Sequence, residues 1–167
     1  MLAWLDAVEA ECLTRCGEHR AALALLRHAE EVLGAAGEHL SPDWFTWFSA
    51  TRLAAFKGNT ESAAGLLPQA RCTLEAVLAG LPGTDGKQRV VVLGDLAAVA
   101  VAERRPEDAC ELLEEALDQL SLTWYATGME RVRAARRALA PWGGTAAVQH
   151  VDDRLYSWTA TLSSLQR

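Results

Sequence analysis

The chain has 167 residues, of which half are apolar and 23% are charged, and its formal net charge at pH 7 is −6. This length and apolar content are typical of one folded domain with a substantial core, and they exclude a disordered polar chain. Domains that bind nucleic acid usually present a basic surface, so the acidic balance argues against direct DNA or RNA binding by this chain. The arginines between positions 131 and 137 are expected to lie on a solvated helix face.

No apolar run reaches the roughly 18–20 residues that a membrane-spanning helix needs. The first six residues lack the basic and apolar segments of a secretory signal. The cysteines at positions 12, 16, 72 and 110 are scattered along the chain, which favours reduced thiols over a disulfide framework. We therefore expect a cytoplasmic protein that does not associate with a membrane.

Apolar residues recur with helical periodicity along the whole chain. The apolar run at residues 90–93 continues to Val101 without a turn signal, so it fits a buried helix better than a strand. Ser41 and Pro42 are typical of a helix start, and proline or glycine also marks breaks at 82–86 and 141–144. The pattern predicts helices near residues 2–16, 19–35, 42–64, 67–80, 87–104, 106–120, 124–139 and 145–164.

Six positions recur three times, displaced from Ala10 to Gly58 and then to Ala97. The copies are Ala10, Leu13, Gly17, Ala22, Leu26 and Ala29; Gly58, Glu61, Gly65, Ala70, Leu74 and Val77; and Ala97, Ala100, Arg104, Ala109, Leu113 and Ala116. Small residues at the first and fourth positions let the two helices of a hairpin approach closely. A glycine at the third position lets the chain leave the first helix in a left-handed conformation.

These offsets resemble the tetratricopeptide repeat. The resemblance implies an all-α fold, a right-handed stack of about four helical hairpins in a single domain spanning residues 1–167. The hairpins are expected near 1–35, 42–80, 87–120 and 124–165, with the last one capping the stack. Because the intervals between copies exceed the family's length of about 34 residues, we expect longer first helices in the second and third hairpins.

A narrower resemblance rests on residues 41–45, 52–60, 87–97 and 124–131. These runs are similar to the C-terminal half of bacterial XRE-type helix-turn-helix transcriptional regulators that carry tetratricopeptide-like sensor domains. The resemblance implies regulation through binding of a ligand or peptide. Such regulators begin with a DNA-binding domain, which this sequence does not contain, so we expect no DNA contact from this chain.

Tetratricopeptide arrays bind partners along a concave groove, and the family's register predicts which residues line it. The predicted groove residues are Phe45, Phe48, Arg52, Asn59, Gln88, Val91, Asp95 and Tyr125. Asn59 could hold a peptide backbone, because its amide both donates and accepts hydrogen bonds. The alternatives are that the polar members are ordinary solvated residues and that the aromatic cluster at 44–48 packs between neighbouring hairpins.

The sequence offers no set of catalytic residues and no phosphate-binding loop. Cys12, Cys16 and His19 have a spacing that zinc could use, but Gly17 is expected to end the helix before His19, and no fourth ligand is evident. We therefore predict packing cysteines, with no metal, no cofactor and no catalysis. An enzyme with its active site in the helical groove is the third and least supported hypothesis.

Both terminal helices carry wide apolar stripes that need a cover. The first offers Leu2, Trp4, Leu5, Val8, Cys12 and Leu13, and the last offers Val148, Val151, Leu155, Trp158, Leu162 and Leu165. We therefore predict a homodimer whose interface uses one terminal helix, through Trp4 or through Trp158 with Leu155 and Leu162, with the aromatic patch at 44–48 as a further candidate surface. The leading functional hypothesis is a domain that senses a peptide, a protein partner or a small molecule. The second is a structural homodimerisation module without a ligand.

Overall fold

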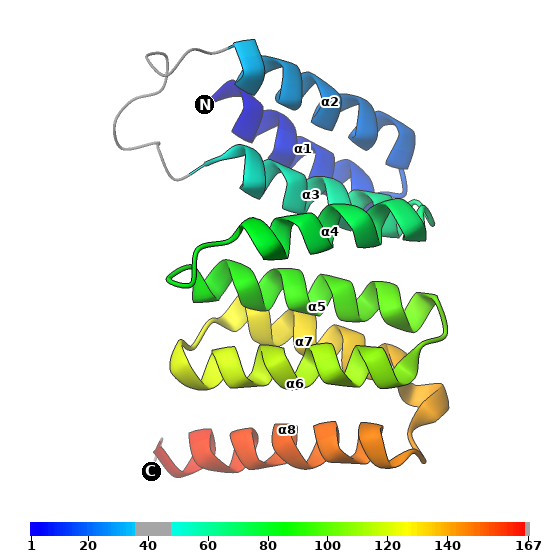
Figure 1. Cartoon of the computed structure of the whole chain (residues 1–167), viewed down its shortest axis with the longest axis vertical. Coiled ribbons are helices and arrows are strands. Elements are labelled where there is room, and N and C mark those ends of the chain that lie inside the picture. Colours follow the sequence, from blue (N-terminus) through cyan, green and yellow to red (C-terminus); the bar gives the residue numbers. More distant parts are fainter. Residues whose placement is uncertain (36–47, 166–167) are drawn as a thin grey trace. The chain divides into compact units, whose positions relative to one another are not determined.

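The computed structural model describes residues 1–35 and 48–165, and the side chains of these residues as far as 158. Every regular element in that part of the chain is helical (Figure 1), which confirms the prediction of an all-α protein. The helices are α1 (Leu2–Arg15), α2 (His19–Ala35), α3 (Ala50–Ala63), α4 (Leu67–Gly80), α5 (Gly86–Ala102), α6 (Pro106–Leu122), α7 (Ala126–Ala138), the short 3-10 helix η2 (Ala140–Trp142) and α8 (Ala146–Leu165).

The third helix begins later than the sequence predicts. Ser49 has an extended backbone, and its side chain accepts a hydrogen bond from the Arg52 amide at 3.3 Å, so it caps a helix that starts at Ala50. Residues 48 and 49 are therefore not helical, so the prediction of a helix that begins at residue 42 is wrong at these two positions. Residues 42–47 lie outside the described residues. The prediction that the first helix of the second hairpin is longer is wrong, because α3 and α1 both have 14 residues. The first helix of the third hairpin, α5, is longer, with 17 residues.

The chain divides into two compact units, Met1–Leu81 and Pro82–Arg167. In the first unit, α1 pairs with α2 and α3 pairs with α4, while α3 also packs on α1 and α2. In the second unit, α5 pairs with α6, and α7 packs on both of them. The final helix, α8, packs along α6 and forms the outer edge of this unit (Figure 1).

Three hairpins share one turn geometry. The residues at the third repeat position, Gly17, Gly65 and Arg104, all have a left-handed backbone, with φ of 82°, 77° and 60°. In each turn the amide of the next residue donates to a carbonyl five positions back at 2.9 Å, closing the first helix. This confirms the predicted exit from the first helix, including the copy in which arginine replaces glycine.

The small residues of the repeat lie where helices meet. Ala22, Ala70 and Ala109 are each fully buried, as the repeat predicts. Leucine at the fifth position is buried in every copy as well. Close packing of this kind leaves little room for larger side chains at the small positions.

Candidate functional site

The surface between α6 and α8, here called the α6–α8 seam, holds the two cavities described below and a network of ion pairs. On the α8 side, Val148 and Val151 are fully buried, so one apolar face of the helix is anchored to the unit. Further along the same helix, Arg154 donates to Glu114 at 2.5 Å and to Asp118 at 2.7 Å. A single arginine therefore connects α8 to two carboxylates of α6.

A second ionic contact joins α8 to α7. Arg136 donates through Nε and Nη2 to the two carboxylate oxygens of Asp152, each at 2.5 Å. This forked geometry is the strongest form of an arginine–carboxylate pair. The hydrogen bond from Arg136 holds the pKa of Asp152 below its usual range. Both residues are charged at neutral pH, so the contact is electrostatic.

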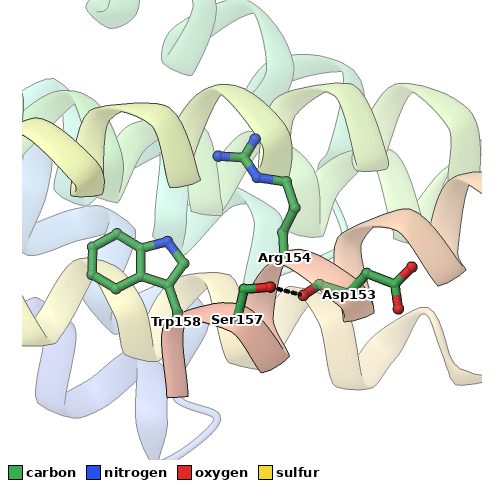
Figure 2. Close-up of a pocket in the computed structure, with 4 residues that line it drawn as sticks. All are labelled: Asp153, Arg154, Ser157 and Trp158. Atoms are coloured by element: carbon green, nitrogen blue, oxygen red, sulfur yellow. Dashed lines mark hydrogen bonds between the residues drawn. The ribbon is translucent and has the colours of Figure 1, made fainter. Parts of the chain in front are cut away.

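The larger cavity of the seam has a volume of about 410 Å³ and is lined by Asp153, Arg154, Ser157 and Trp158. Figure 2 shows the Arg154 guanidinium and the Trp158 indole rising from the same side of α8, while the Asp153 carboxylate points away from them. The Trp158 ring lies 5.5 Å from that of Trp124, centroid to centroid. The cavity can therefore receive a flat or apolar group beside an arginine.

The smaller cavity, about 260 Å³, is acidic. Its lining residues are Glu107, Cys110, Glu111, Glu114, Ala147 and His150. Burial raises the pKa of the Cys110 thiol, and the nearby Glu107 and Glu114 carboxylates raise it further. The thiol is therefore protonated at neutral pH and is a poor nucleophile. His150 Nε2 lies 3.8 Å from Glu114 Oε1, too far for a hydrogen bond.

The Ser157 hydroxyl donates to the Asp153 carbonyl of its own helix at 2.9 Å. Among the described residues, no group of three or more His, Cys, Asp or Glu side chains is placed to hold a metal ion. None of the described helices is long and apolar enough to cross a membrane.

The predicted groove residues fall in both units. In the first unit, Phe48 is 7% exposed and packs edge-on against Phe56 at 6.4 Å between ring centroids, so its side chain belongs to the core. Arg52 and Asn59 are half-buried on α3. Phe45 lies outside the described residues. For this unit, Arg52 and Asn59 are the predicted side chains that retain accessible surface.

In the second unit, Asp95 is buried, and its carboxylate lies 3.5 Å from the Arg131 guanidinium of α7. Gln88 and Val91 are half-buried on α5. Tyr125 is half-buried, and Lys87 lies 5.9 Å from the centre of its ring. The predicted groove residues thus belong to two separate units, and a groove formed by residues of both units stays a prediction.

The residues predicted at a dimer interface have mixed exposure. Trp4 is half-buried against the core of the first unit, whereas Leu2, Leu5 and Val8 are exposed on α1. Leu155 and Trp158 are half-buried, and the Leu162 side chain lies outside the described part. The prediction that Cys12 and Cys16 pack is wrong, because both are exposed.

Sequence reasoning missed the α6–α8 seam, although one signal was present. Helix α6 carries acidic residues and no basic one: Glu107, Asp108, Glu111, Glu114, Glu115 and Asp118. The described part of α8 contains a single basic residue other than histidine, Arg154. The carboxylates of α6 repel one another unless positive charges lie near them. Arg154 is one of the residues that supply such a charge.

Comparison of the chain with family models, with curated proteins and with solved structures finds no match. Its function is therefore inferred from its own residues and geometry.

Proposed function

We propose that this chain is a cytoplasmic tetratricopeptide-like domain that binds a protein or peptide partner, or a small molecule, as the sensor part of a transcriptional regulator. Support for the repeat architecture comes from the three hairpins with one turn geometry. Support for the regulatory role comes from the sequence runs that resemble XRE-type regulators. The domain acts by binding and carries out no catalysis.

The observation that carries the binding role is the outer face of α1. Its inner face is built from alanines, with Ala3, Ala7 and Ala10 buried. Among its bulky apolar side chains, Trp4 and Leu13 pack against the core, whereas Leu2 and Leu5 are 53% and 48% exposed. A contiguous exposed apolar face of this kind commonly marks an interaction site. We infer that a partner covers α1.

The proposal is tested by substituting residues of this exposed face and measuring which proteins the chain still binds. Tagged parent chain and a Leu5→Glu/Val8→Glu variant are exposed to extract of the native host, and the retained proteins are quantified by mass spectrometry. We expect at least one protein to be retained by the parent and lost from the variant. Arg20→Glu, an exposed position on α2 with the same change in net charge, is the control and should retain it. Equal retention by all three chains, or none by the parent, would count against the proposal.

The alternative is a homodimerisation module, in which a second copy covers the same face. Met1, Leu5, Val8 and Cys12 follow one another at spacings of four, three and four residues, and all are exposed. That spacing is typical of a seam between two helices. Light scattering distinguishes the two functions. A mass near twice 18.1 kDa that falls to the monomer mass in Leu5→Glu/Val8→Glu, with no foreign protein retained, favours the dimerisation module.

A further inference from the structure

The described part of α8 is attached to the second unit through a small buried face. Helix α8 packs along α6, and Val148 and Val151 are completely buried among the side chains of α8 that the structure describes. Isolated helices are marginally stable in water, so α8 depends on these contacts. Its other described contacts include the ion pairs of the seam and the ring contact between Trp158 and Trp124.

Those ion pairs are partly open to solvent. The Arg154 side chain is 26% exposed, and those of its partner Asp118 and of Asp152 are 68% and 47% exposed. Salt screens charges that solvent reaches and weakens pairs of this kind. The hold of α6 and α7 on α8 is therefore sensitive to ionic strength, unlike the apolar contacts inside the α5–α6 hairpin.

The seam also contains open hollows. The two cavities, of about 410 and 260 Å³, are lined in part by Arg154 and by Glu114, which form an ion pair with each other. Both cavities open to solvent, so water and salt ions can approach the charged groups of the seam.

Two consecutive glycines precede α8. Gly143 and Gly144 join η2 to the helix, and no atom lies within 4 Å of the position that a Cβ on Gly144 would take. Glycine allows a wider range of backbone angles than other residues. The two glycines therefore give this connection more backbone freedom than other residues would, and in this structure the Thr145 amide closes the turn by donating to the Trp142 carbonyl at 2.9 Å.

We propose that α8 is a displaceable helix, which leaves α6 and α7 as a unit while α5, α6 and α7 remain folded. Its departure uncovers the face of α6 around Cys110, which is 3% exposed when α8 is docked. The docked helix thus controls access to that face. This regulation is independent of which partner covers α1.

Cys110 reports the movement directly. In the full-length chain, Cys12, Cys16 and Cys72 are replaced by serine, so that Cys110 is the remaining cysteine. The rate of its modification by a thiol reagent is measured against NaCl and urea concentration, relative to the unfolded chain. We expect modification at low urea to exceed the rate set by global unfolding, with weak dependence on urea. Raising NaCl from about 0.05 to 1 M should accelerate it roughly three- to tenfold.

Two substitutions test the role of the ion pairs. Arg154→Gln removes the pairs with Glu114 and Asp118, so modification at low salt should become several-fold faster and lose the part of its salt dependence that these pairs supply, while the pair of Arg136 with Asp152 remains. Arg105→Gln removes a pair with Asp108 in the first turn of α6, outside the seam, and should leave the rate unchanged. Global unfolding by urea is measured for each variant, so a general loss of stability is recognised.

Two results would overturn the proposal. One is modification of Cys110 that follows global unfolding in its urea dependence and ignores both salt and Arg154→Gln. The other is modification as fast as in the unfolded chain under every condition, because the seam would then not close over Cys110.

Discussion

Gly58 of α3 lies directly against Leu74 of α4, and a Cβ on Gly58 would stand 2.6 Å from Leu74 Cγ. Leu74 is fully buried, so it cannot move aside freely. Both positions belong to the repeat, the first small and the fifth leucine. The pair explains physically why the small position of this hairpin is occupied by the smallest residue.

Gly58→Ala should therefore destabilise the first unit by about 1–3 kcal/mol, because overpacking outweighs the gain in helix propensity. Gly34 provides a matched control on α2, since a Cβ there meets no atom within 4 Å. Gly34→Ala should be neutral or slightly stabilising. Urea denaturation of the two variants gives the comparison, and an equal effect of both would show that Leu74 is not confined.

Arg104 has the left-handed backbone that glycine has in the other two turns. A residue with a Cβ pays about 1–2 kcal/mol for this conformation, partly offset by the entropy that glycine loses on folding. Arg104→Gly should therefore raise the free energy of unfolding by about 0.5–1 kcal/mol. Arg104→Ala keeps the Cβ, so its thermal midpoint should stay close to that of the parent. If Arg104→Gly and Arg104→Ala stabilised the chain equally, the gain in stability would come from loss of the arginine side chain and not from relief of the backbone conformation.

Acid should weaken the contact between Asp152 and Arg136. Because the pKa of Asp152 is lowered in the folded chain, its ionised form contributes stability above the pKa of the unfolded chain, about 3.9. That contribution is lost as the pH falls through the folded pKa. Asp152→Asn should thus cost a few tenths to about 1 kcal/mol at pH 7, since the pair is half exposed.

The cost of Asp152→Asn should shrink below about pH 4, where the parent's carboxyl begins to take up a proton. Asp153→Asn, whose carboxylate points away from the Arg154 and Trp158 side chains (Figure 2), is the control and should behave as the parent does. Urea denaturation at pH 7 and at lower pH values measures both. A cost that is the same at every pH would mean that the ion pair adds no stability.

Duplex DNA should not bind this chain on its own. Phosphate contacts require clustered lysine and arginine, whereas the formal net charge here is −6. In a fluorescence anisotropy titration with random duplex at about 150 mM salt, we expect no saturable signal in the micromolar range. Saturable binding that weakens steeply with salt would contradict this.

The sequence predicts the helices and their turns well because both depend on local rules. Helical periodicity and the repeat placed α1, α2 and α4 to α8 within a few residues of their bounds. Ser49 was missed as a helix cap because Ser41 followed by proline is a stronger start signal in sequence. The hydrogen bond from the Arg52 amide identifies Ser49 as the cap of α3, whereas Ser41 lies outside the described residues.

The α6–α8 seam could not be predicted in the same way. Arg154 and Glu114 are 40 residues apart, and their contact exists only because α8 returns along α6. Cavities likewise arise from how helices pack in three dimensions. The acidity of α6 indicates that a cation is needed, but which arginine supplies it depends on the tertiary fold.

The constant spacing inside each hairpin has a consequence for engineering. The first and fourth repeat positions are always twelve residues apart, from Ala10 to Ala22, Gly58 to Ala70 and Ala97 to Ala109, whereas the intervals between hairpins differ. Extra residues in a flexible connection cost only a slowly growing closure entropy. A reporter peptide should therefore be tolerated in the α4–α5 connection at Gly83, while one inserted after Gly65 would separate two helices whose contact requires that fixed distance.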